Sequence, residues 1–227
     1  MIKNAVCAAA AGVRLFDEVN MIKRLVLREG PVDVCSYFYI DDVSSHGFLF
    51  DPGAQAQRII SLIGKEGYKI DKIIITHGHF DHIGALDGVR EKTGIPAYIH
   101  ENGKRFLSDP HYNLSERIGR TISTQADGYF RDGDVLTTAD GGLSLRVIHT
   151  PGHTDDSCVF YSEKEGVAFT GDTIFKGTFG NYRFPTGDYG LLMKTIREKV
   201  LTLPEKTVLY SGHTEETTVE DEAWMYL

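Results

Sequence analysis

The segment at residues 76–84, which reads Thr-His-Gly-His-Phe-Asp-His-Ile-Gly, constrains the fold and chemistry of this chain more than any other. It follows three consecutive isoleucines at residues 73–75, an apolar β-branched run typical of a buried strand. After it, apolar residues recur at helical spacing, which predicts a helix over residues 83–92. Three histidines and an aspartate therefore crowd a loop between a strand and a helix, where a rigid scaffold often holds functional side chains.

Other apolar runs predict a chain of mixed strands and helices. Strands are expected at residues 22–28, 34–41, 47–50, 96–100, 135–138, 143–149, 157–161, 167–170 and 207–210. Helices are expected at residues 54–66, 101–107, 189–203 and 219–226, with Gly67 ending the first of them. Residues 108–128 show no firm period and are expected to be a surface excursion, and residues 171–188 are expected to be irregular.

Two halves of the chain share one order of elements. The first half reads strand, Asp51, helix, strand, His77, and the second reads strand, Asp172, helix, strand, His213. Each half could form a sheet with helices on one face, so the two sheets would pack as a four-layer αββα sandwich of the α+β class. Because no composition break marks a linker, residues 1–227 are expected to form a single domain.

Composition excludes several classes of function. A formal charge of −8 argues against a nucleic-acid binder that depends on a broad basic face. The three cysteines are widely spaced and form no Cys-x-x-Cys pair, which argues against a disulfide framework or a zinc ribbon and favours a reducing cytoplasm. No apolar run approaches the roughly 18 residues that indicate a membrane span, so no membrane partner is expected.

Residues 1–21 allow two interpretations. A short apolar run at residues 5–11 loosely imitates an export signal. Charged residues follow it at once, at Arg14, Asp17 and Glu18, which favours an N-terminal extension or an extra strand.

Seven side chains share one setting, in polar loops that directly follow apolar runs. They are His77, His79, Asp81, His82, His153, Asp172 and His213. Imidazole and carboxylate donors together suit zinc, iron or manganese without any thiolate. The other four histidines are expected to be structural: His46, His100, His111 and His149.

The spacing of these side chains supports two metal ions. His77 and His79 are two residues apart and can face one side of a turning loop, where they could hold one ion. Asp81 and His82 lie where the chain enters the helix and would be displaced toward a second ion. A carboxylate such as Asp172 can bridge ions about 3.5–4 Å apart. A bridging water would then titrate near pH ~7 and supply hydroxide for attack on a carbonyl or phosphoryl centre.

Taken together, four ordered motifs resemble the metallo-β-lactamase superfamily over residues 22–217. They are His77-x-His79-x-Asp81-His82, Thr150-Pro151-Gly152-His153-Thr154, Phe169-Thr170-Gly171-Asp172-Thr173 and Gly212-His213. The resemblance implies the αββα sandwich. It also implies a ligand set of His77, His79 and His153 for one metal and of Asp81, His82 and His213 for the other, with Asp172 as the bridge.

Within the superfamily the chain resembles the glyoxalase II (hydroxyacylglutathione hydrolase) branch, on residues 169–177, 113–115 and 212–218. This implies a binuclear hydrolase of small-molecule thioesters or esters, with zinc as the expected ion and iron or manganese as alternatives. Asp172 and Asp81 are the expected catalytic carboxylates, Asp81 orienting the nucleophile. Asp172 stands where a zinc β-lactamase would have cysteine, which argues against lactam hydrolysis as the main activity.

Substrate recognition departs from that branch. The helical C-terminal domain that helps hold glutathione is not expected, because the sequence stops soon after His213. The basic residue that would meet the glutathione carboxylate falls at Asn181, with Arg183 and Lys176 as substitutes. Thr214-Glu215 follows His213, where members of that branch commonly have Gly-Pro.

Several alternatives stay open at this point. Asp51 either orients a ligand histidine or is only the turn residue of an Asp-Pro-Gly segment. Four side chains either line the substrate pocket or pack in surface loops: Tyr112, Tyr182, Arg183 and Phe184. The competing functions are a mono-iron persulfide dioxygenase, a lactonase and a non-catalytic sensor of a small ligand.

Overall fold

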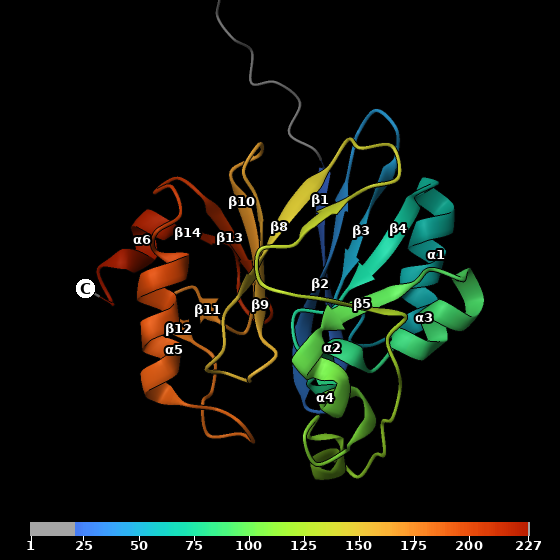
Figure 1. Cartoon of the computed structure of the whole chain (residues 1–227). Helices are drawn as coiled ribbons and strands as arrows, with labels where there is room; N and C mark the ends of the chain where they lie inside the picture. Colours follow the sequence, from blue (N-terminus) through green and yellow to red (C-terminus); the bar gives the residue numbers. More distant parts are fainter. Residues whose placement is uncertain (1–20, 227) are drawn as a thin grey trace, which may run out of the picture.

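A computed structural model describes residues 21–226 and contains two six-stranded sheets that pack face to face, with helices on the outer side of each (Figure 1). The first sheet consists, in spatial order, of β1 (Met21–Glu29), β2 (Val32–Ile40), β3 (His46–Phe50), β4 (Lys69–Ile74), β5 (Ala97–His100) and β6 (Gly128–Phe130). The second consists of β14 (Thr217–Thr218), β13 (Val208–Ser211), β10 (Val167–Gly171), β9 (Cys158–Ser162), β8 (Ser144–His149) and β7 (Val135–Thr137).

Helices cover the outer faces of the two sheets. Those that follow strands of the first sheet are α1 (Ala56–Glu66), α2 (Phe80–Ile83), α3 (Leu86–Thr93) and α4 (Lys104–Ser108), with the 3-10 turns η1 (Glu101–Gly103) and η2 (Ser115–Ile118). Those that follow strands of the second sheet are α5 (Tyr189–Thr195), its π-helical continuation η3 (Ile196–Val200) and α6 (Val219–Ala223). A small hairpin, β11 (Ile174–Phe175) with β12 (Thr178–Phe179), precedes α5. The expected αββα sandwich is confirmed.

Three apolar layers hold the sandwich together. Leu49 of β3 packs in the layer under α1 and α3, whereas its neighbour Phe50 points to the opposite face and packs between the sheets. There the Phe50 ring stacks on Phe169 of β10, with 4.0 Å between ring centroids. The third layer, with Leu192 and Ile196, lies between the second sheet and α5. Strands that are buried on both faces have continuous apolar sequences. Fully burying one large apolar side chain stabilises the folded state by about 1.5–3 kcal/mol.

The repeated order of elements corresponds to a structural repeat. In the first half β3 and β4 pair in parallel, joined through α1. In the second half β10 and β13 pair in parallel, joined through α5. Parallel neighbours need a crossover connection, and their carboxyl ends lie at the same edge of the sheet. The residues that follow these four strands are therefore brought to one edge of the sandwich.

The helix predicted over residues 83–92 is present as α3, but it begins three residues later than predicted. A turn at residues 84–85 separates it from α2, which ends at Ile83. The amide of Ala85 donates to the carbonyl of Pro52, at 2.9 Å, instead of continuing the helix. Pro52 follows β3, so a contact remote in sequence ends α2 after one turn and leaves Asp81 and His82 on a short, separate helix.

Other boundaries also differ from the expectations. Residues 108–128 are not only a surface excursion, since Asn113 is fully buried and β6 extends the first sheet from Gly128. Residues 171–188 include the β11–β12 hairpin, and the helix over 189–203 changes to π-helical geometry at Ile196. Strands of two or three residues carry too little periodicity to be found from the sequence.

The expectations for residues 1–20 lie outside the described residues. Within residues 21–226, no helix combines the length and the apolar character needed to cross a membrane.

Candidate metal centre

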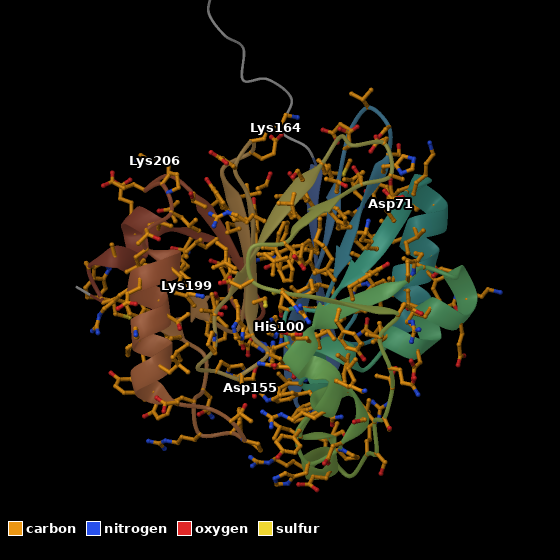
Figure 2. The ribbon with its side chains drawn as sticks, viewed as in Figure 1. Asp71, His100, Asp155, Lys164, Lys199 and Lys206 are labelled. Carbon is orange, nitrogen blue, oxygen red and sulfur yellow. The ribbon has the colours of Figure 1, made fainter. Side chains whose placement is uncertain are left out.

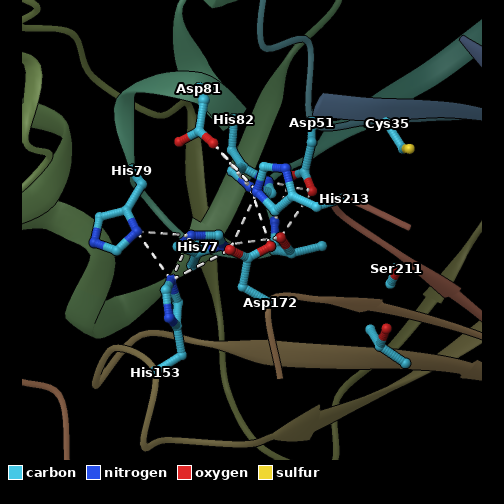
Figure 3. A network of polar contacts seen from close by, with 12 residues as sticks. Cys35, Asp51, His77, His79, Asp81, His82, His153, Asp172, Ser211 and His213 are labelled. Carbon is cyan, nitrogen blue, oxygen red and sulfur yellow. Dashed lines mark hydrogen bonds and ion pairs between the residues drawn. The ribbon is translucent and has the colours of Figure 1, made fainter. Parts of the chain in front are cut away.

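Four loops at the shared edge of the two sheets bring the seven candidate ligands together (Figure 3). Residues 75–79 follow β4 and lead into α2, and residues 150–157 connect β8 to β9. Asp172 directly follows β10, and residues 212–216 follow β13. The site is thus built by elements that are far apart in the sequence but end at one edge of the sandwich.

His77, His79 and His153 form a triangle of ring nitrogens. His77 Nε2 lies 3.0 Å from His79 Nδ1, and His153 Nε2 lies 3.1 Å and 3.0 Å from these two atoms. The three rings are nearly perpendicular to one another, at 83°, 85° and 87°. Tetrahedral ligands at metal–nitrogen distances of about 2.0–2.1 Å would be about 3.3 Å apart, so the triangle fits one metal ion.

Burial keeps these three imidazoles in the neutral form that a metal requires. It lowers the pKa of His77 well below its ordinary value, and the neighbouring rings of His82 and His79 lower it further. Burial, together with the His153 ring, does the same to the pKa of His79. Burial also lowers the pKa of His153, although Asp172 opposes this shift. Neutral rings keep a free lone pair for a metal at neutral pH.

Asp81, His82 and His213 form a second group beside the first. Asp81 Oδ2 lies 3.3 Å from His213 Nε2 and 3.9 Å from His82 Nε2. His82 Nε2 is buried and has no hydrogen-bond partner within residues 21–226. A buried nitrogen without a partner is costly unless a ligand completes it, so this group also fits a cation.

Asp172 lies between the two groups (Figure 3). Its Oδ2 lies 3.3 Å from His213 Nε2 and 3.6 Å from His153 Nε2, so it contacts one histidine of each group. Its Oδ1 lies 3.4 Å from His82 Nε2 and has no hydrogen-bond partner within the described part of the chain. One carboxylate therefore has oxygens available to both groups, which is the geometry of a bridging ligand.

The second group carries an excess of negative charge. Burial disfavours the charged form of His82, yet Asp51, Asp172 and Asp81 together raise its pKa to about 10. Burial likewise opposes the charge on His213, but Asp172 and Asp81 raise its pKa to about 12. Without a metal, protons on these two rings would balance the carboxylates. A bound divalent cation would supply the same charge and displace those protons.

The outer nitrogen of each histidine in the second group has a partner that fixes the ring. Asp51 Oδ2 accepts from His82 Nδ1 at 2.9 Å, and the carbonyl of Asp33 accepts from His213 Nδ1 at 2.6 Å. In the first group, the carbonyl of Asn181 accepts from His153 Nδ1 at 2.8 Å. A proton on Nδ1 leaves the Nε2 lone pair directed into the site.

Asp51 is in turn held by Thr76. Its Oδ1 accepts from the Thr76 amide at 2.8 Å, and its Oδ2 accepts from the Thr76 hydroxyl at 2.7 Å. Asp51 thus contacts the candidate ligand His82, as expected if it orients a ligand histidine and is not only a turn residue. Thr76 and the carbonyls of Asp33 and Asn181 were not predicted from the sequence. The two carbonyls are main-chain groups that every residue carries, and the Thr76 contact depends on the pairing of distant segments.

A second buried carboxylate, Asp156, was also missed. It is fully buried, and its Oδ2 accepts from the Gly78 amide at 2.9 Å, which fixes the chain between His77 and His79. Burial raises the pKa of Asp156 to about 7. The sequence did offer one indication of this role, because Asp156 lies three residues after His153 in a loop of mostly polar residues.

The candidate substrate residues divide into two sets. Phe184 faces the site edge-on, with its ring centroid 5.4 Å from that of His79, and Tyr112 packs 5.7 Å from Phe106, whose ring is 6.1 Å from His79. The other set consists of side chains directed elsewhere. Lys176 pairs with Glu215, and Asn181 Oδ1 accepts a hydrogen bond from the Arg183 amide. The Tyr182 ring packs 5.0 Å from that of Tyr189, and the Arg183 guanidinium lies 5.7 Å from the centroid of the Tyr182 ring.

The four remaining histidines lie outside these two groups. His46 contacts Asp71 at 3.0 Å, and His111 contacts Glu116 at 2.9 Å. His100, labelled in Figure 2, stacks on His149 with 4.1 Å between the rings. Burial and then His149 lower the pKa of His100 to about 4.

Comparison with known proteins agrees with this geometry. Residues 30–213 match the family model described as the Metallo-beta-lactamase superfamily. The chain is 39% identical over 195 residues to the probable metallo-hydrolase YqgX of Bacillus subtilis, covering 84% of this chain and 89% of the relative. It is 31% identical to the hydroxyacylglutathione hydrolase GloC of Haemophilus influenzae, covering 83% and 88%.

A solved structure has the same architecture. The crystal structure of the BLEG-1 B3 metallo-beta-lactamase superposes with a TM-score of 0.83 at 38% identity, covering 89% of this chain and 96% of the other. Members of the superfamily bind divalent metals, and the two groups of histidines and aspartates stand at the edge of the sandwich where the motifs converge. The chain belongs to the metallo-β-lactamase superfamily.

Proposed function

We propose that the chain is a binuclear metal-dependent hydrolase of thioesters such as hydroxyacylglutathione, in the glyoxalase II branch of the superfamily. Seven residues would hold two divalent ions, zinc being the first expectation and iron or manganese the alternatives. The observation that carries the proposal is the position of Asp172, whose Oδ2 lies 3.3 Å from His213 and 3.6 Å from His153. The 31% identity with a hydroxyacylglutathione hydrolase supports the substrate class.

Two divalent ions bound there would bring the pKa of a shared water to about 7 and polarise the thioester carbonyl. The chain's own residues position the reactants. Asp172 links the two groups, because its Oδ2 lies 3.6 Å from His153 Nε2 and 3.3 Å from His213 Nε2. Asp81, whose Oδ2 lies 3.3 Å from His213 Nε2, would accept a hydrogen bond from the attacking water and orient it toward the carbonyl carbon. The rings of Phe106 and Phe184 pack against His79 and exclude bulk water on that side.

The leaving group favours a thioester over an amide. A thiol has a pKa of about 8.5, so its thiolate departs without a proton from the protein. An amine is a far poorer leaving group and requires a positioned general acid. In this site Asp81 contacts His213, and the ring nitrogens of His153 and His77 contact each other, so these side chains are not free to act as a general acid. The site therefore suits a reaction whose leaving group needs no proton.

The test is metal removal and restoration. Chelated protein should lose hydrolysis of S-lactoylglutathione and regain it with added zinc, iron or manganese, and bound metal measured by elemental analysis should approach two ions per chain. Asp172→Ala and His79→Ala should abolish the restored activity. Full activity in either variant would contradict the proposed site.

Hydrolysis of β-lactams is the second candidate, because a solved structure described as a B3 metallo-beta-lactamase is 38% identical to this chain. A chromogenic cephalosporin assayed beside the thioester separates the two. Turnover of the cephalosporin at a higher kcat/KM than the thioester would reverse the order of these candidates. Oxygen consumption with glutathione persulfide, without thioester hydrolysis, would instead favour the dioxygenase.

A further inference from the structure

We propose that the Arg117 guanidinium, held over the Phe184 ring at the side of the metal centre, binds a carboxylate on the thiol portion of the substrate. The inference rests on the proposed thioester hydrolysis and names the substrate class, which is acyl thioesters of acidic thiols. Arg117 lies in η2, within residues 108–128, and was not among the candidate substrate residues.

The position of Arg117 follows from two ring contacts. The Phe184 ring packs edge-on against His79, with 5.4 Å between centroids, and Arg117 Cζ lies 5.2 Å from the Phe184 centroid. A guanidinium stacked on an aromatic face keeps its N–H edges free for bidentate contact with a carboxylate. Two extended peptide residues span about 7 Å, a length comparable to the separation of His79 and Arg117 that these two ring contacts permit.

Arg117 is available for a ligand, unlike other arginines of the first half. Within residues 21–226 its side chain has no hydrogen bond or ion pair, and its guanidinium lies over the Phe184 ring. By contrast, Arg105 pairs with Asp155 and Arg90 with Asp127. The unpaired charge near the metal centre can therefore be satisfied by an anionic substrate group.

The loop that presents Arg117 is held rigidly by Asn113. The fully buried Asn113 amide donates to the carbonyls of Phe106 and Ile122, at 2.8 Å and 2.9 Å, and its Oδ1 accepts from the Ser115 amide at 3.0 Å. Its own carbonyl accepts from the Phe80 amide at 2.8 Å, which ties the loop to α2. A pre-organised loop loses little entropy when it binds a ligand.

The cations that the sequence suggested for this role lie elsewhere. Lys176 Nζ lies 3.2 Å from Glu215. Arg183 lies over Tyr182, whose ring packs against Phe179 and Tyr189, whereas the Phe184 ring under Arg117 packs against the candidate ligand His79. Asn181 uses its carbonyl to hold His153. Arg117, which approaches the site from the opposite half of the molecule, is thus the cation that the structure places beside Phe184.

The test compares two thioesters that differ only in the terminal charge: S-lactoyl-N-acetylcysteinylglycine and its glycinamide. The metal-loaded wild-type protein should prefer the acid by about tenfold in kcat/KM, mainly through KM, as expected for one charge-assisted contact. Arg117→Met should abolish this preference, so that the two kcat/KM values become about equal, and Arg117→Lys should keep part of it. Equal loss for both substrates in Arg117→Met, or an unchanged preference, would overturn the inference.

Arg146→Met is the matched control. Arg146 is also an exposed arginine over an aromatic ring, 5.6 Å from Tyr161, but it lies on β8 outside the metal groups. This variant should keep the wild-type preference. Loss of the preference there would show that it does not report a specific contact at Arg117.

A binding measurement separates this inference from the proposed function. Calorimetry with the non-hydrolysable thioether S-propyl-N-acetylcysteinylglycine and its amide should show the same tenfold preference, lost in Arg117→Met. Should the wild-type protein hydrolyse neither thioester yet bind the acid through Arg117, the proposed function fails and the carboxylate site stands. Should it hydrolyse both equally, with no preference in binding, the function stands and the carboxylate site fails.

Discussion

Asp51 and Asp172 follow matching strands in the two halves of the molecule, β3 and β10, but their surroundings differ. The oxygens of Asp51 are occupied by donors of the protein itself, the amide and hydroxyl of Thr76 and Nδ1 of His82. Asp172 instead faces the Nε2 atoms of three histidines, and its Oδ1 has no hydrogen-bond partner within residues 21–226. The same place in a repeat can therefore serve to position a ligand or to offer one, depending on which donors reach the carboxylate.

The backbone also distinguishes the two aspartates. Asp51 has a φ of 46°, a left-handed conformation that is uncommon for a residue other than glycine. In the second half the preceding residue, Gly171, carries the positive φ of 49° instead. The left-handed turn at Asp51 is held by its contacts with Thr76 and by the Ser36 hydroxyl, which donates to the Asp51 carbonyl. Such strain persists where surrounding contacts over-determine it.

The largest expected effect concerns Asp172. Asp172→Ala should lower kcat/KM for the thioester by about a thousandfold or more, because it removes the carboxylate shared by both metal groups. Bound metal, measured by elemental analysis, should fall below two ions per chain. The circular dichroism spectrum should remain that of the wild-type protein. If Asp172→Ala retained two ions per chain and full activity, Asp172 would not be a metal ligand and would not differ from Asp51 in this respect.

Asp51→Asn should have a smaller effect. It keeps the shape of the side chain but replaces a carboxylate oxygen that accepts from His82 Nδ1, and loss of such a partner costs about 10- to 100-fold in metal affinity or activity. Competition with a chromogenic chelator measures that affinity. A loss as large as that of Asp172→Ala would show that Asp51 is itself a ligand.

Metal-free protein should become less stable as the pH rises. The pKa values of His82, about 10, and of His213, about 12, lie above the usual value of about 6.5 in an unfolded chain. The stabilisation is therefore complete below pH ~6.5 and is lost as the pH rises toward about 10. Urea unfolding of chelated protein between pH 6.5 and 9.5 should show a fall of a few kcal/mol, and metal-loaded protein a smaller one. Equal slopes for both forms would contradict this account of the charge balance.

The smallest expected effect concerns Thr76. Thr76→Val removes the hydroxyl that donates to Asp51 Oδ2 but keeps the amide that donates to Oδ1, so activity should fall only a fewfold. Thr76→Ser retains the hydroxyl and is the matched control, expected to stay near the wild-type rate. A larger loss in the serine variant than in the valine variant would exclude this role for the hydroxyl.

Much of the fold could be predicted from local pattern. The strands β1 to β5 and β7 to β10 coincide with apolar runs, and α1 ends at Gly67, which has a left-handed φ of 70° and donates to the Ile63 carbonyl. The break between α2 and α3 could not be predicted, because the acceptor of the Ala85 amide is Pro52, more than thirty residues earlier. Local periodicity carries no information about such a contact.

The sequence by itself indicated the seven candidate metal ligands, because histidines and aspartates follow directly after apolar, strand-like runs in ordered motifs. The repeated order of strand, acid, helix, strand and histidine suggested the sandwich, and the resemblance of four motifs to the metallo-β-lactamase superfamily implied it. Only the tertiary structure decided that Asp172 lies within 3.6 Å of histidines from both groups while Asp51 is held by Thr76. Only it placed Arg117 over Phe184, because the orientation of a side chain depends on packing between segments that the sequence keeps far apart.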